Sequence, residues 1–138
     1  MHPVLVIVLG ITLLTVVGIA FGGTFLLRVG NGRIPANDLQ KTFFRAGHAH
    51  AGVLVALGLL VAVLTHVVGA SPGWAAAGAI AVLSAAIFVP AGFFLSVLGP
   101  DPQRPGPMIA SVWVGATSLV AGLVISGVAV LAAGIAAL

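Results

Sequence analysis

Four long apolar stretches, separated by short polar or proline-rich segments, constrain the fold of this chain more than any other feature. They cover about residues 3–27, 43–68, 74–98 and 108–137, and each exceeds the roughly 20 residues that a helix needs to cross a bilayer. In hydrocarbon, only helices and closed barrels satisfy all of their backbone hydrogen bonds. Residues 1–138 are therefore predicted to form one transmembrane domain. We expect an all-α integral membrane protein, a four-transmembrane-helix bundle with mostly antiparallel helices.

The composition supports a membrane protein and excludes several other classes. The chain is 61% hydrophobic and 5% charged, whereas about a quarter of a typical soluble domain is charged. The lipid bilayer is its predicted partner. A formal net charge of +3 is too small for a nucleic-acid-binding surface, so no nucleic acid is expected. The absence of cysteine excludes disulfides, thiolate nucleophiles and Cys-ligated metal sites.

The basic residues predict how the chain is threaded. All of them fall in or beside the first and third connections, at Arg28, Arg33, Lys41, Arg45 and Arg104. The positive-inside rule then places both long loops in the cytoplasm and both termini on the non-cytoplasmic side. Heavy use of Ala, Gly and Val with a single Lys is typical of high-GC bacteria, so the expected location is the bacterial cytoplasmic membrane.

Small residues four apart predict close helix packing at two places. Gly18 and Gly22 form one such pair in the first stretch, and Ser118 and Gly122 form another in the last. For Gly22, room for a flat ligand is the alternative interpretation.

The chemistry of the chain is concentrated in residues 42–54, where Arg45, His48 and His50 lie in the first turns of the second stretch. His48 and His50 are two residues apart and so point to nearly opposite sides of a helix, which excludes a shared metal. Arg45 lies one turn before His48 on the same face and could meet a propionate, a lipid phosphate or Asp101. His66 is expected to be an interfacial residue near the other end of the helix.

Flat and small side chains are predicted at the same depth as His48. Gly22, Phe93 and Phe94 all fall in the half of the membrane nearer the long loops. Together with an interior histidine they could enclose a planar ligand, and ordinary aromatic packing is the alternative.

The segment from Arg45 to Leu54, with its Arg-x-x-His pattern, resembles the helix that carries a low-spin haem ligand in catalytic subunits of haem–copper oxidases and nitric oxide reductases. The resemblance covers about a dozen residues and implies that His48 is a haem ligand preceded by Arg45. Those subunits supply a second histidine from another helix, which this chain lacks. Met108 or a second copy of the chain would then complete the coordination. The chain also resembles small four-span bacterial membrane proteins with a similar His-x-His segment, which implies a fold but no activity.

The leading functional hypothesis is a membrane-embedded cofactor-binding module, with b-type haem on His48, for electron transfer or sensing. The candidate cofactor-binding residues are His48, His50, Arg45, Gly22, Phe93 and Phe94, with His48 as the metal ligand. One alternative is a non-catalytic scaffold, either a homo-oligomer or an accessory subunit of a larger membrane complex. Another is a small His-lined transporter or channel. No catalytic residues are predicted, because paired carboxylates, a phosphate loop and a nucleophile–base set are all missing.

Overall fold

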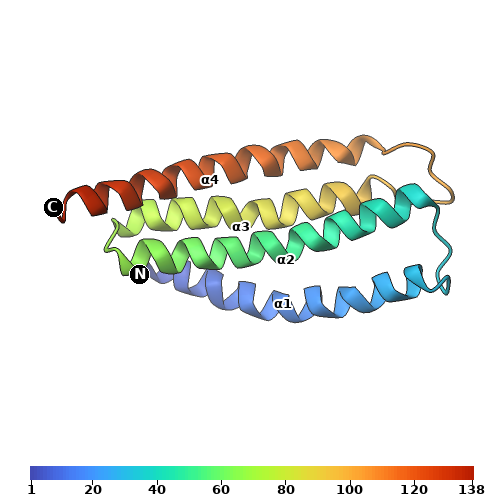
Figure 1. Ribbon diagram of the computed structural model, residues 1–138, viewed down its shortest axis with the longest axis horizontal. Helices are drawn as coiled ribbons and strands as arrows, with labels where there is room; N and C mark the ends of the chain where they lie inside the picture. The colour runs from blue at the N-terminus through green and yellow to red at the C-terminus, as the bar shows by residue number, and fades with distance from the viewer.

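The computed structural model describes residues 1–138 as four long helices and contains no strand (Figure 1). They are α1 (Pro3–Gly30), α2 (Asp38–Val67), α3 (Pro72–Leu95) and α4 (Ala110–Ile135), the last preceded by a short 3-10 helix, η1 (Pro107–Ile109). All four are long and apolar enough to cross a membrane. They run alternately up and down, so both termini lie at one end and the two long connections at the other. The predicted all-α fold is confirmed.

Helix α2 begins at Asp38 rather than near Phe43, because Asn37 caps it. The Asn37 side-chain oxygen accepts a hydrogen bond from the Gln40 backbone N at 2.9 Å, and the Gln40 side-chain oxygen accepts one from the Asn37 backbone N at 3.1 Å. This reciprocal capping box satisfies two backbone donors at the helix start. The helix therefore extends beyond the apolar run by more than one polar turn.

Helix α3 packs closely against α4 because both present small residues at their interface. A Cβ added to Gly122 would lie only 2.8 Å from both the Val82 N and the Gly78 O, so no larger residue fits there. Ser118, one turn before Gly122, donates to the Ala81 carbonyl at 2.9 Å and contacts the Ser84 hydroxyl at 2.6 Å. The Ser118–Gly122 pair thus serves helix packing, as predicted.

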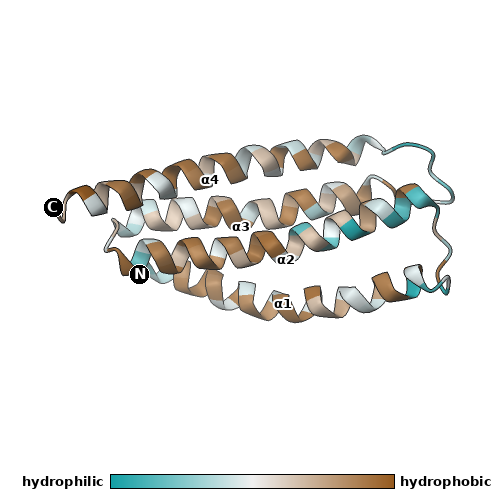
Figure 2. Cartoon of the chain, viewed as in Figure 1, coloured by the Kyte–Doolittle hydropathy of each residue, from teal (hydrophilic) through white to brown (hydrophobic).

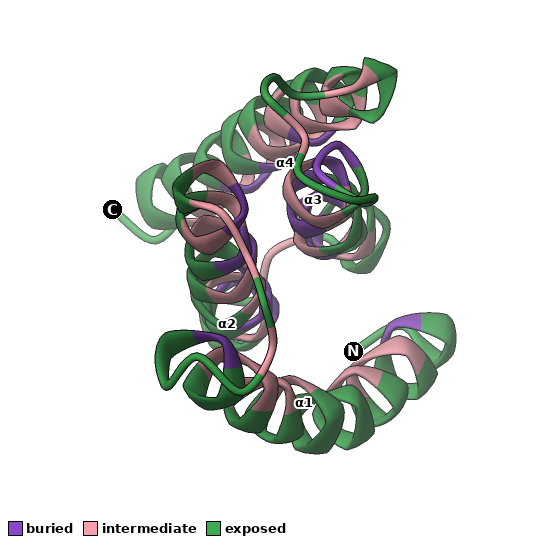
Figure 3. Ribbon diagram, turned by 90° about the vertical axis from the view of Figure 1, so that its right-hand side faces the viewer, coloured by how far each residue is buried: buried purple, intermediate pink, exposed green.

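Helix α1 lies beside α2 and away from α4, at the outside of the bundle (Figure 3). Its only buried residues are Leu5 and Val29, near its two ends, and it makes no contact with α4. Leu5 packs with Val61 and other residues of α2 and α3, while Val29 packs with Phe44. Helix α1 is therefore held to the bundle mainly at its ends.

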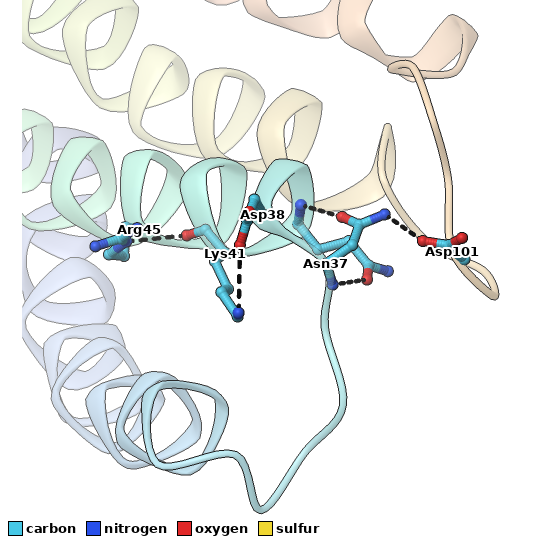
Figure 4. A network of polar contacts seen from close by, with 6 residues as sticks. Asn37, Asp38, Lys41, Arg45 and Asp101 are labelled. Carbon is cyan, nitrogen blue, oxygen red and sulfur yellow. Dashed lines mark hydrogen bonds and ion pairs between the residues drawn. The ribbon is translucent and has the colours of Figure 1, made fainter.

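The polar residues gather at the end of the bundle that carries the long connections (Figure 2). All five basic and both acidic residues lie there. The Asn37 side-chain amide donates to Asp101 Oδ1 and to the Pro102 carbonyl, both at 2.8 Å (Figure 4). Gln40 donates to the Val97 and Gly99 carbonyls, both at 3.1 Å. These bonds tie the start of α2 to the connection between α3 and α4.

Candidate functional site

His48 lies in the seam between α1 and α2, which we define as the facing surfaces of these two helices from Gly30 and Lys41 inward. A Cβ on Gly22 would be 3.6 Å from His48 Nδ1, and one on Gly23 would be 3.8 Å from Nε2. The two glycines thus let the α1 backbone lie against the imidazole. His48 is half-buried, and neither ring nitrogen has a hydrogen-bond partner or is fully enclosed by protein. The seam therefore holds a histidine whose nitrogens are accessible to a ligand.

Two cations line a small pocket at the loop end of the same seam. The pocket has a volume of about 220 Å³ and is lined by Lys41 and Arg45 of α2 and by Leu26, Val29 and Gly30 of α1. Arg45 Nε donates to the Lys41 carbonyl at 3.2 Å, and Lys41 Nζ lies 3.4 Å from Asp38 Oδ1. Arg45 has no acidic partner, so its guanidinium is available to an anionic group. Arg45 precedes His48 along one helix face, as predicted.

An apolar cavity lies in the other direction along the seam. Its volume is about 430 Å³, and it is enclosed by α1, α2 and α3. Its walls include Ala51 and Val55, one and two turns beyond His48, and Ile19, one turn from Gly22. The seam therefore runs from two cations, past an imidazole, into an apolar cavity.

The structure packs the remaining predicted site residues, His50, Phe93 and Phe94, where α2 meets α3. The His50 ring packs on Phe93 of α3 with ring centroids 5.2 Å apart, and its Nδ1 lies 2.7 Å from the Ala46 carbonyl. Phe94 stacks on Phe44 at 5.5 Å. A Cβ on Gly47 would come within 2.7 Å of the Phe94 ring. His48 and His50 thus face different helices, and Phe93 and Phe94 pack within the α2–α3 interface rather than around His48.

Neither Met108 nor His66 reaches His48. Met108 belongs to η1, which packs on α3 and α4, whereas His48 faces α1 on the other side of the bundle. His66 is exposed near the opposite end of α2. No three His, Asp or Glu side chains come together in a possible metal cluster. A metal bound to His48 would therefore be coordinated by one side chain of this chain.

Several residues of the seam are missed by sequence reasoning. Lys41 was assigned to the basic loop and not to the site, although it precedes Arg45 by one turn. Its place in the site is visible in the sequence once α1 and α2 are known to be neighbours. Thr12, Thr15 and Ser84, which line the apolar cavity, carry no such signal, because single hydroxyls occur in many membrane helices.

Comparison of the chain with known protein families, with curated proteins and with solved structures gives no match.

Proposed function

We propose that this chain is a membrane-embedded cofactor-binding module whose site is the α1–α2 seam, with b-type haem on His48, serving electron transfer or sensing. The observation that carries the proposal is the half-buried imidazole of His48, whose two nitrogens are unpaired and accessible within an apolar helix pair. Histidines inside membrane spans are rare and usually face a partner or a ligand. Here the protein itself supplies no partner.

The surroundings of His48 suit an amphiphilic planar cofactor. Arg45 and Lys41 line the pocket toward the loops, where the propionates of a haem would need cations. Toward the membrane centre the seam is apolar, as the porphyrin edge requires. A single imidazole ligand corresponds to five-coordinate haem, which leaves the sixth position to a gas or to a second molecule.

A porphyrin on His48 requires α1 to stand further from α2 than it does in this structure. Atoms in contact across a flat ring are separated by roughly 3.5–4.0 Å on each side. A Cβ on Gly22 would already be 3.6 Å from the imidazole, so no ring fits between them as packed. Because α1 is buried only at Leu5 and Val29, the displacement costs few contacts. The proposal therefore includes an outward shift of the middle of α1.

The deciding experiment is a visible absorption spectrum of the protein purified from haem-replete cells, oxidised and reduced. The proposal predicts a Soret band with stoichiometric iron in the wild type. His48→Ala should abolish the band, and the matched control His50→Ala should retain it, because His50 faces α3. A colourless wild type that gains no band on addition of haem would refute the proposal, as would equal loss in both variants.

We also propose that the protein resides in a bacterial cytoplasmic membrane with its long connections in the cytoplasm. The support is the gathering of all five basic residues at one end of the bundle. Single cysteines at Gln103 and at Leu138 of this cysteine-free chain provide the test. A membrane-impermeant thiol reagent added to intact cells should label the second and spare the first. The reverse pattern would invert the threading.

The second candidate function is a non-catalytic subunit of an oligomer or larger membrane complex. It is favoured by α1, in which Gly10 and Gly18 have no neighbour within 4 Å of an added Cβ and so present a small-residue surface to the membrane. Under this alternative His48→Ala leaves the spectrum unchanged, and Gly18→Leu changes the oligomeric state in cross-linking. A His-lined transporter finds less support, because His48, His50 and His66 do not line one continuous path through the bundle.

A further inference from the structure

The apolar cavity between α1, α2 and α3 has the properties of a binding site for a lipid-soluble molecule. Its volume of about 430 Å³ lies within the range of roughly 300–1,000 Å³ found for small-molecule sites. Ile11 of α1 and Ile87 of α3 line it and are 58% and 67% exposed, so the cavity opens between these two helices. Both positions are near the middle of their helices, at a depth where the surroundings are lipid. A ligand therefore enters from the bilayer.

Two threonine hydroxyls of α1 line this otherwise apolar cavity. Thr12 donates to the Val8 carbonyl at 2.8 Å and Thr15 to the Thr12 carbonyl at 2.7 Å, whereas the third hydroxyl, Ser84, is paired with Ser118 of α4 at 2.6 Å. A hydroxyl has one donor and two acceptor lone pairs. Since both threonines donate to carbonyls of their own helix, their oxygens offer acceptors to the cavity and no donors. The complementary ligand carries O–H groups on an otherwise apolar body.

We infer that this cavity binds a polyprenyl quinol, with its ring hydroxyls on Thr12 and Thr15 and its chain along the opening between α1 and α3. A phospholipid chain would fill the volume but leave the acceptor lone pairs of Thr12 and Thr15 unused. Thr15 and Thr12 lie seven and ten residues from Gly22, which adjoins His48, so the ring lies about 10–15 Å from that imidazole by helical rise. The use of such a ligand as a redox partner rests on the proposed function. The binding itself does not depend on a haem.

The test is titration of the purified full-length protein, in nanodiscs that contain phospholipid, with a decyl-substituted benzoquinol and separately with the corresponding quinone. Wild-type protein should bind the quinol saturably and at least about fivefold more tightly than the quinone, which has no O–H. Ala51→Phe fills the cavity and should weaken quinol binding at least about tenfold. The control Ala129→Phe fills a different cavity of about 440 Å³, near the termini, and should have no effect.

Thr15→Val keeps the shape of an exposed side chain and removes one acceptor. It should reduce the preference for quinol over quinone without altering the fold, which protects the test against misfolding of Ala51→Phe. Equal effects of Ala51→Phe and Ala129→Phe, equal affinity for quinol and quinone, or no saturable binding in phospholipid nanodiscs would each overturn the inference. His48→Ala should retain quinol binding, so a failure of the haem proposal and a failure of this one give different results.

Discussion

Gly47 of α2 lies against α3, whereas Gly22 of α1 lies against His48 of α2, and alanine should destabilise the fold at the first position but not at the second. At Gly47 the new Cβ would come within 2.7 and 2.8 Å of two carbons of the Phe94 ring and 3.3 Å of the Phe93 Cβ. The Phe94 ring is itself stacked on Phe44, so it has little freedom to move away. At Gly22 the nearest atom, His48 Nδ1, would be 3.6 Å away, an ordinary van der Waals contact.

The magnitudes follow from two opposing terms. Overpacking a tight interface costs typically about 1–3 kcal/mol. Replacing Gly by Ala within a helix returns up to about 1 kcal/mol through helix propensity. Gly47→Ala should therefore lower the free energy of unfolding by about 1–2 kcal/mol, a factor of roughly 5–30 in the folding equilibrium. Gly22→Ala should be neutral or slightly stabilising.

The assay is reversible unfolding in mixed micelles with increasing dodecyl sulfate, followed by far-ultraviolet circular dichroism. The double variant Gly47→Ala/Phe94→Leu should recover part of the loss, because the smaller side chain relieves the overlap and makes the two changes non-additive. If Gly22→Ala destabilises as much as Gly47→Ala, the packing of α2 on α1 is as tight as its packing on α3. The seam is then not the loose interface that a cofactor site requires.

Two further substitutions test the interactions that hold the helices together. Asn37→Ala removes the α2 cap and both bonds to the connection between α3 and α4, so the loss should reach the upper end of the range for caps, about 2 kcal/mol, seen as a lower Tm. The control is Asn31→Ala, because the Asn31 side chain makes no hydrogen bond. Equal Tm values for the two variants would contradict the role of Asn37. Ser118→Ala should cost about 0.6 kcal/mol, the average for hydrogen bonds between membrane helices, measured by the same unfolding titration. Thr117→Val, which loses a bond only within α4, should cost less.

The number and order of the helices could be predicted from the sequence because each span is a long and mainly apolar run bounded by polar or proline-rich segments. The span predicted over residues 43–68 begins later than α2 because hydropathy records entry into hydrocarbon, whereas the helix begins at its cap. Asn37 and Gln40 carry that signal in the sequence. Residue spacing was likewise sufficient to separate His48 from His50, since the angle between side chains on a helix depends only on their distance along the chain.

The partner of each face of α2 could not be predicted in this way. Phe93, Phe94 and Gly22 lie at similar depth, and depth alone suggested one pocket around His48. The rotation of each helix about its axis decides otherwise, and it is set by contacts such as that between Gly47 and Phe94. All four helices are apolar on nearly every side, so their sequences carry little information about which side faces inward.

The attachment of α1 at two ends has a consequence for biogenesis. Helices α2, α3 and α4 share the extensive interfaces of the bundle, so they form the cooperative folding unit. Helix α1 precedes all three in the chain, yet Leu5 packs on Val61 and Val29 on Phe44 and Val97, which are synthesised later. Helix α1 is therefore a solitary helix until its docking surface emerges. Under the proposed function, this interval is when a cofactor would enter the seam before the helix closes over it.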